Sequence, residues 1–134
     1  MVPEAMRAAY ILKKELGYET RVLNVHTLKP IDEEAILRAA LETGAVVTAE
    51  EHQIGALAWR VSGILTESPQ LYGLPIITGA IGVKDRFGDS GAPWELIKEF
   101  EVSAEHIAHK AVELMAVKKR PPVQREERSL VTAR

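Results

Sequence analysis

Two carboxylates and a histidine stand side by side directly after a short apolar run, as Glu50, Glu51 and His52. The run, residues 45–49, is bounded by turn signals and is typical of a strand that is covered on both faces. In open α/β sheets, ligands bind where such strands end. A histidine beside carboxylates can serve there as a general base or make charged contacts with a neighbouring domain. The structural alternative is a solvated strand exit at which His52 caps the next helix.

A second polar segment, residues 85–91, combines two acids, an arginine and a serine with two glycines. It reads Asp85, Arg86, Phe87, Gly88, Asp89, Ser90 and Gly91. The segment lacks the residue order of a nucleotide-binding P-loop, so a phosphate-binding role is not supported. Asp89 and Ser90, followed by Pro93, favour a turn and a helix cap, which makes a structural role the prediction. Trp59 is predicted to be a packing or interface anchor.

An alternation of helices and strands must position these residues. Helical periodicity, capping residues and glycine stops predict helices over residues 3–16, 32–43, 56–65, 93–100 and 103–117. Ser103 is predicted to cap the last helix. Short apolar or β-branched runs predict strands over residues 20–25, 45–49 and 74–81. The alternation predicts a three-layer α/β/α fold with a mainly parallel sheet, in which these three strands are mutually parallel.

Length and composition predict a single domain, residues 1–117, followed by a basic and disordered tail, residues 118–134. The tail carries six Lys or Arg against two Glu, whereas the chain as a whole has a net charge of −2. There is no cysteine, which excludes disulfides and thiolate chemistry. No apolar run reaches the length of a membrane span, so we expect a cytoplasmic protein that binds neither membrane nor nucleic acid.

The order of these segments resembles the C-terminal domain of the transketolase family of thiamine-diphosphate enzymes. The resemblance covers about residues 3–114. Besides Glu50 to His52 and residues 85–91, it includes residues 27–36, which read Thr-Leu-Lys-Pro-Ile-Asp-Glu-Glu-Ala-Ile. This run matches the family's T-x-K-P-x-D-E-E-A-I segment. The resemblance implies the same three-layer α/β/α fold.

Transketolases transfer a two-carbon ketol unit between sugar phosphates with thiamine diphosphate and Mg²⁺, which two other domains hold. The resemblance therefore implies a non-catalytic C-terminal subunit or fragment that contributes to assembly and dimerisation. Its partner would be a chain that carries the thiamine-diphosphate and pyrimidine domains. We expect no catalytic, cofactor-binding or metal-binding residue in this chain. The expected interface residues are Glu50, Glu51, His52, Trp59 and the segment 85–91.

The chain departs from the family pattern in two places. Residues 53–58 stand where the family has glycines after its histidine, and two of those glycines are replaced by alanine. The family domain also begins with two strands before its first helix, and the second of them is central in the sheet. Because this chain starts within that helix, we expect an incomplete sheet and therefore association with another chain. Direct pairing of residues 20–25 with 45–49, or a strand donated by a partner, would close the gap.

Two alternatives remain open at the level of sequence. The chain can be the equivalent domain of a 2-oxoacid dehydrogenase β-subunit or of a deoxyxylulose-phosphate synthase. The run Glu50, Glu51, His52 and the segment 85–91 favour transketolase over these relatives. Alternatively, it can be a free-standing interaction module that has lost the enzyme.

Overall fold

The structure is a computed structural model that describes residues 1–119, so residues 120–134 of the predicted tail lie outside the described residues. Two parallel strands form the middle layer of the fold. The elements in chain order are α1 (Val2–Leu16), α2 (Glu33–Thr43), β1 (Ala45–Gln53), α3 (Leu57–Glu67), the 3₁₀ helix η1 (Pro69–Leu71), β2 (Ile77–Val83), α4 (Pro93–Glu99) and α5 (Ala104–Lys118). Among these helices, none has the length and apolar content needed to cross a membrane.

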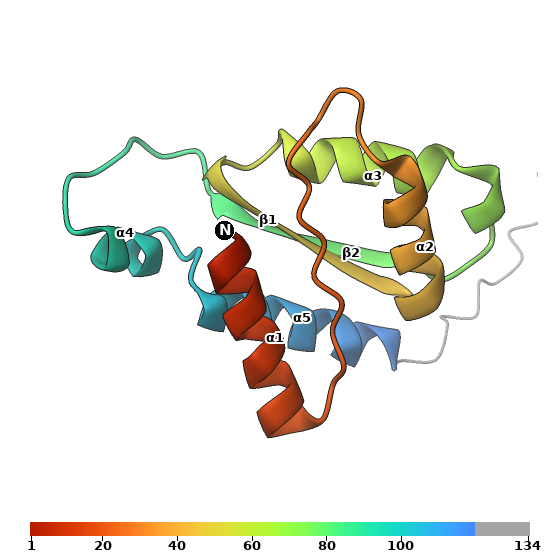
Figure 1. Cartoon of the computed structure of the whole chain (residues 1–134), viewed down its shortest axis with the longest axis horizontal. Helices are drawn as coiled ribbons and strands as arrows, with labels where there is room; N and C mark the ends of the chain where they lie inside the picture. Colours follow the sequence, from red (N-terminus) through yellow and green to blue (C-terminus); the bar gives the residue numbers. More distant parts are fainter. Residues whose placement is uncertain (120–134) are drawn as a thin grey trace, which may run out of the picture.

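Helices cover both faces of the sheet, with α1 and α5 on one side and α2 and α3 on the other (Figure 1). The strand β1 supplies both cores because successive side chains of a strand point to opposite faces. Val47 and Ala49 pack against the cluster of α1 and α5, whereas Val46 packs against the cluster of α2 and α3. The predicted three-layer α/β/α fold is therefore confirmed.

Local sequence signals explain most helix ends. Asp32 accepts a hydrogen bond from the backbone N–H of Ala35 at 3.0 Å, as a helix cap does. Gly17 and Gly44 end α1 and α2 in the left-handed region, with φ of 69° and 62°. Ser103 occupies the first position before α5, but its side chain makes no cap hydrogen bond. The carboxylate of Glu4 in α1 replaces it and accepts from the N–H of Ala104 at 2.7 Å.

The two observed strands differ from the predicted ranges. β1 extends to Gln53 rather than to residue 49, so Glu50, Glu51 and His52 lie within the strand and not beyond it. β2 begins at Ile77 rather than at residue 74, and it runs parallel to β1 with Ala45 opposite Ile77. The parallel arrangement predicted for this pair is confirmed.

The predicted strand over residues 20–25 is wrong. These residues belong to a connection between α1 and α2 that contains no helix or strand. Within the described chain, residues 19–30 make no backbone–backbone hydrogen bond. The β-branched pattern predicted extended backbone, but a strand exists only where a neighbour completes its ladder. The direct pairing of residues 20–25 with β1 that would close the sheet does not occur in this structure.

Candidate functional site

The carboxylate of Glu50 holds the turn between β1 and α3. Only 4% of the residue is exposed. Its two oxygens accept backbone hydrogen bonds from Gly55 and Leu57 at 2.9 Å each and from Ala58 at 3.3 Å. A carboxylate at a helix start satisfies donors that the helix cannot pair, and it opposes the positive end of the helix dipole. Glu50 therefore caps α3, which is the role that the structural alternative had given to His52.

The two neighbours of Glu50 in the motif are exposed. The side chain of His52 lies with Nδ1 3.6 Å from Oε2 of Glu50 and 3.0 Å from the carbonyl oxygen of Gln53. The side chain of Glu51 is exposed on the same strand. Glu50 thus fixes the local backbone, while the side chains of Glu51 and His52 are exposed, and the Glu51 carboxylate lies 3.8 Å from the amino group of Met1.

Gly82 in β2 lies close to Glu50 and Ile54 of this turn. It was not among the functional residues predicted from the sequence. A Cβ at this position would lie 2.7 Å from Cγ1 of Ile54 and 3.0 Å from Cγ of Glu50. Real Cβ atoms essentially never lie 2.7 Å from another atom, so a side chain at this position would force the Ile54 side chain or the backbone to shift. A glycine inside a strand marks a close backbone approach, but the predicted strand ended at residue 81, so this signal appears only once β2 is seen to extend to Val83.

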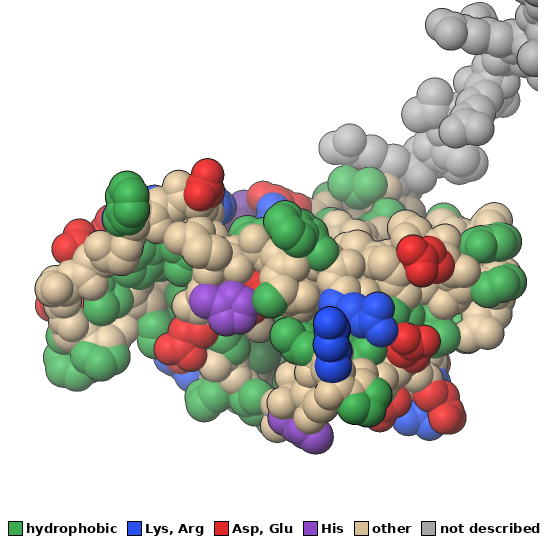
Figure 2. Space-filling view, turned by 90° about the horizontal axis from the view of Figure 1, so that it is seen from above, with side chains coloured by type: hydrophobic (Ala, Val, Ile, Leu, Met, Phe, Trp, Pro, Cys, Tyr) green, Lys and Arg blue, Asp and Glu red, His purple; other side chains and the backbone are tan. Residues whose placement is uncertain are grey.

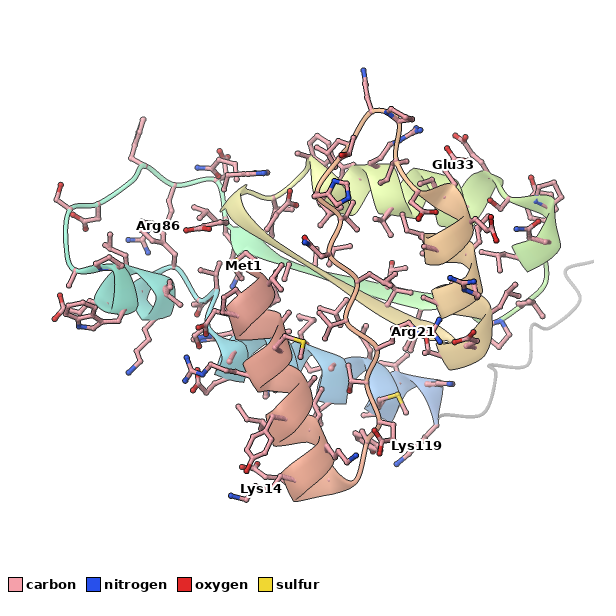
Figure 3. The ribbon with its side chains drawn as sticks, viewed as in Figure 1. Met1, Lys14, Arg21, Glu33, Arg86 and Lys119 are labelled. Atoms are coloured by element: carbon pink, nitrogen blue, oxygen red, sulfur yellow. The ribbon has the colours of Figure 1, made fainter. Side chains whose placement is uncertain are left out.

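The segment 85–91 lies beside the carboxyl end of β1. Gln53 donates a side-chain hydrogen bond from Nε2 to the backbone oxygen of Arg86 at 2.7 Å. Arg86 extends toward α4, where its guanidinium pairs with Glu99 at 2.9 Å and stacks 4.7 Å from the ring centre of Phe100 (Figure 3). Asp89 accepts the N–H of Ser90 at 2.8 Å, which is the turn chemistry expected from the sequence. The structure therefore brings the two predicted segments together at one edge of the sheet.

Lys84 and Glu101 connect the start of this segment to the end of α4. The Lys84 ammonium donates a hydrogen bond to the Glu101 carboxylate and so lowers the pKa of Glu101 below its ordinary value. Both side chains are exposed, so this pair adds little to stability.

Three aromatic side chains project from this region. Phe87 is 96% exposed, Trp94 is 69% exposed and Trp59 is 73% exposed. Figure 2 shows hydrophobic side chains on the surface at the end of the molecule formed by α4 and the preceding segment. The ring of Trp59 lies over Gly55, so part of its position is fixed by the turn that Glu50 holds. Exposed aromatic residues are enriched at the centres of protein interfaces.

A cavity of about 840 Å³ lies along β1 on the side away from β2. We call it the edge cavity. Its walls are β1, the connection over residues 17–25, and parts of α1, α2, α3 and α5. Most of the lining side chains are apolar, and the polar residues Glu50, Glu51 and His52 line the cavity at the carboxyl end of β1.

Thiamine diphosphate and Mg²⁺, which the family resemblance implies, require several oxygen ligands in one place. Within residues 1–119, no group of three or more His, Cys, Asp or Glu is placed to hold a metal ion. The buried carboxylate of Glu50 is already engaged with three backbone N–H groups. The described part of the chain does not offer a site that fits the metal–diphosphate group.

Comparison with known proteins agrees with the fold. The family described as "Transketolase, C-terminal domain" matches residues 1–107. The chain is 43% identical over 115 residues to the 6-deoxy-6-sulfo-D-fructose transketolase subunit SqwH of Clostridium sp. (strain MSTE9). The matched region covers 85% of this chain and 34% of that protein. It is 33% identical over 114 residues to the 1-deoxy-D-xylulose-5-phosphate synthase of Heliobacterium modesticaldum (strain ATCC 51547 / Ice1), covering 85% of this chain and 17% of that protein.

A solved structure described as "Split gene transketolase, inactive beta4 tetramer" superposes with a TM-score of 0.78 and 36% sequence identity. The match covers 88% of this chain and 37% of that chain. This chain thus spans about a third of the length of the transketolase subunit and of the solved transketolase chain that it resembles. The chain belongs to the transketolase C-terminal domain family.

Proposed function

We propose that this chain is a non-catalytic C-terminal part of a transketolase and that it contributes to assembly and dimerisation of the enzyme in the cytoplasm. The enzyme transfers a two-carbon ketol unit between sugar phosphates with thiamine diphosphate and Mg²⁺. In this proposal residues 1–117 form the domain, and a separate chain supplies the thiamine-diphosphate and pyrimidine domains.

The observation that carries the proposal is the family match combined with its extent. The match is to a C-terminal domain, and the similar transketolase proteins are about three times as long as the matched region. One of these is itself described as a subunit, and the solved structure is described as a split-gene transketolase.

The second candidate is the equivalent domain of a deoxyxylulose-phosphate synthase. The similarity to the Heliobacterium modesticaldum enzyme favours it, with 33% identity over 114 residues. The higher identity to the transketolase subunit, 43%, supports transketolase as the first candidate.

A reconstitution experiment tests the proposal. The full chain is mixed with a chain from the same genome that carries the two cofactor-binding domains, and ketol transfer is measured with thiamine diphosphate, Mg²⁺ and a ketose phosphate. We expect no binding of thiamine diphosphate to this chain alone by calorimetry, and ketol transfer that requires both chains. Micromolar cofactor affinity of the isolated chain, or full activity of the cofactor chain without it, contradicts the proposal.

A further inference from the structure

Residues 84–101, which we call the arm, comprise the segment 85–91 and α4 and lie at one end of the molecule (Figure 1). No residue of α4 is buried, whereas α1, α2, α3 and α5 all bury residues. Among the described residues, the backbone hydrogen bonds that the arm makes stay within residues 92–102. The arm is therefore joined to the rest of the domain by side chains, which is typical of a segment with low local stability.

Two contacts attach the arm to the domain. Near the end of α4, Ile97 and Phe100 pack against the cluster of α1 and α5. At the other end of the arm, Nε2 of Gln53 donates a hydrogen bond to the backbone oxygen of Arg86 at 2.7 Å. We call this hydrogen bond the latch. In the described part of the chain, no other hydrogen bond or ion pair connects the arm to the strands or to the other helices.

The two ends of the arm are tied to each other. The ammonium of Lys84 pairs with the carboxylate of Glu101, and the guanidinium of Arg86 pairs with Glu99 at 2.9 Å. The same guanidinium lies 4.7 Å from the ring centre of Phe100. Because these contacts join the ends of the arm rather than the arm and the domain, they remain in place when the arm moves as one unit.

The backbone is strained at both ends of the arm. Asp85 has a φ of 38° and Glu101 a φ of 56°, and no other non-glycine residue within residues 1–119 has a positive φ. A side chain makes this region unfavourable because its Cβ approaches the backbone too closely. Such strain persists only where other contacts hold it, and it often marks a segment that changes conformation. The contact available to hold it here is the latch.

We propose that the arm is a hinged unit with two positions. In the latched position, which this structure shows, Gln53 holds Arg86 and the backbone at Asp85 and Glu101 is strained. In the open position the latch is broken and both residues leave the left-handed region. Hinges of this kind are a few residues at the ends of elements that absorb a change in φ and ψ.

Opening changes the direction of an aromatic surface. Phe87 and Trp94, which are 96% and 69% exposed, both lie on the arm, whereas the latch residue Gln53 directly follows His52 on β1. Ile97 and Phe100 form the pivot and stay against the cluster of α1 and α5. The end of β1 thus controls where the aromatic side chains of the arm point. This inference concerns the domain alone and does not rest on the proposed function.

Distances between two spin labels test whether the arm opens. The full-length chain has no cysteine, so labels can be attached at Ser90→Cys in the arm and at Arg38→Cys on α2, where both side chains are exposed. Labelled chain is diluted with an excess of unlabelled chain, so that pulsed electron paramagnetic resonance measures distances within one molecule. We expect one main distance from the latched arm and a second, less populated distance from the open arm.

Variants of Gln53 test the latch. In Gln53→Ala the ratio of open to latched arm should rise about fivefold, because one hydrogen bond contributes roughly that factor. Gln53→Glu keeps the size of the side chain but removes the N–H donor, and it should raise the ratio as well. Glu51→Ala is the matched control, since the side chain of Glu51 is exposed on the same strand and contacts only the amino group of Met1. This variant should leave the ratio unchanged, with folding of all variants verified by circular dichroism.

Two variants of Glu101 test the hinge. Glu101→Gly and Glu101→Ala both remove the ion pair with Lys84. Glycine adopts a φ of 56° without strain, whereas alanine does not. The latched position should therefore be favoured in Glu101→Gly, with a ratio of open to latched arm about fivefold lower than in Glu101→Ala.

Three results would overturn the inference. Distance distributions of Gln53→Ala and Gln53→Glu that match the unsubstituted chain would show that the hydrogen bond to Arg86 does not hold the arm. A single broad distribution in the unsubstituted chain would show that the arm has no latched position. Equal ratios in Glu101→Gly and Glu101→Ala would show that strain at Glu101 does not drive opening.

Discussion

Glu50 holds three backbone N–H groups that α3 and its preceding turn cannot pair internally. Its neighbour Glu51 belongs to the same motif but is exposed. The two residues therefore give a matched comparison between a carboxylate that organises the backbone and one that faces solvent. At this scale, the motif combines one buried, structural acid with two residues, Glu51 and His52, whose side chains are exposed.

Replacing Glu50 by alanine should destabilise the domain by about 2–4 kcal/mol, because three N–H groups lose a charged acceptor in a buried place. Replacing Glu51 by alanine should change the stability by less than about 0.5 kcal/mol. Urea denaturation of the two variants measures both values. Equal effects of the two substitutions would show that the carboxylate of Glu50 does not hold the turn.

Glu105, in the first turn of α5, should titrate below its ordinary pKa of 4.5. The main cause is the hydroxyl of Ser103, which donates to its carboxylate at 2.6 Å and stabilises the charged form. Because the pKa is lower in the folded chain, this contact adds stability above pH 4.5, and the contribution is lost as the pH falls through the folded pKa.

Carboxyl titration by NMR measures the pKa of Glu105 in the wild type and in Ser103→Ala. We expect the pKa to rise toward 4.5 in the variant. An unchanged value would show that Ser103 is not the cause.

At the scale of elements, β1 is the strand that joins the two hydrophobic clusters to the turn before α3. It contributes side chains to both cores and carries Glu50 at its carboxyl end, and β2 passes beneath its final turn at Gly82. The close approach of the two segments at Gly82 should make this position sensitive to a single added carbon.

Gly82→Ala should destabilise the fold by about 1–3 kcal/mol, because the new Cβ would collide with Ile54. Gly63 in α3 is the matched control, since a Cβ there would meet nothing within 4 Å. Gly63→Ala should stabilise the fold by about 0.5–1 kcal/mol through helix propensity. Thermal melts of both variants give the comparison, and a neutral Gly82→Ala would mean that β2 does not pass so close to the turn.

The helices could be predicted from sequence because their signals are local. Asp32 caps α2, and Gly17 and Gly44 end two helices, as the pattern indicated. The contribution of Glu4 to the start of α5 could not be predicted, because the two residues meet only after α1 and α5 pack. The segment over residues 20–25 has strand propensity, but its state depends on a neighbouring backbone that no local pattern reveals.

The site was predicted in part for the same reason. The motif at Glu50 could be assigned to the carboxyl end of a strand, where ligands bind in open α/β sheets, and its role in an interface stays a prediction. The assignment of roles within the motif depended on which side chain turns inward. That orientation depends on β1 continuing to Gln53. The predicted strand ended at residue 49 and was therefore too short to include the motif.

At the scale of the whole molecule, the described sheet has two strands, and β1 is apolar over most of residues 45–49 and carries its charged side chains, Glu50 and Glu51, only toward its carboxyl end. Each missing ladder bond costs about 1 kcal/mol, against a total stability of about 5–15 kcal/mol for a domain. Together with the exposed aromatic side chains of Trp59, Phe87 and Trp94, this edge should make association the preferred state of the chain.

Sedimentation of the purified full chain at micromolar concentration tests most directly whether the protein is one part of an assembly. We predict a species heavier than the monomer, whose mass falls on dilution as the subunits dissociate. A compact monomer at all concentrations, with a single cooperative thermal transition, would contradict the account, because it would show that the two-stranded sheet is sufficient by itself.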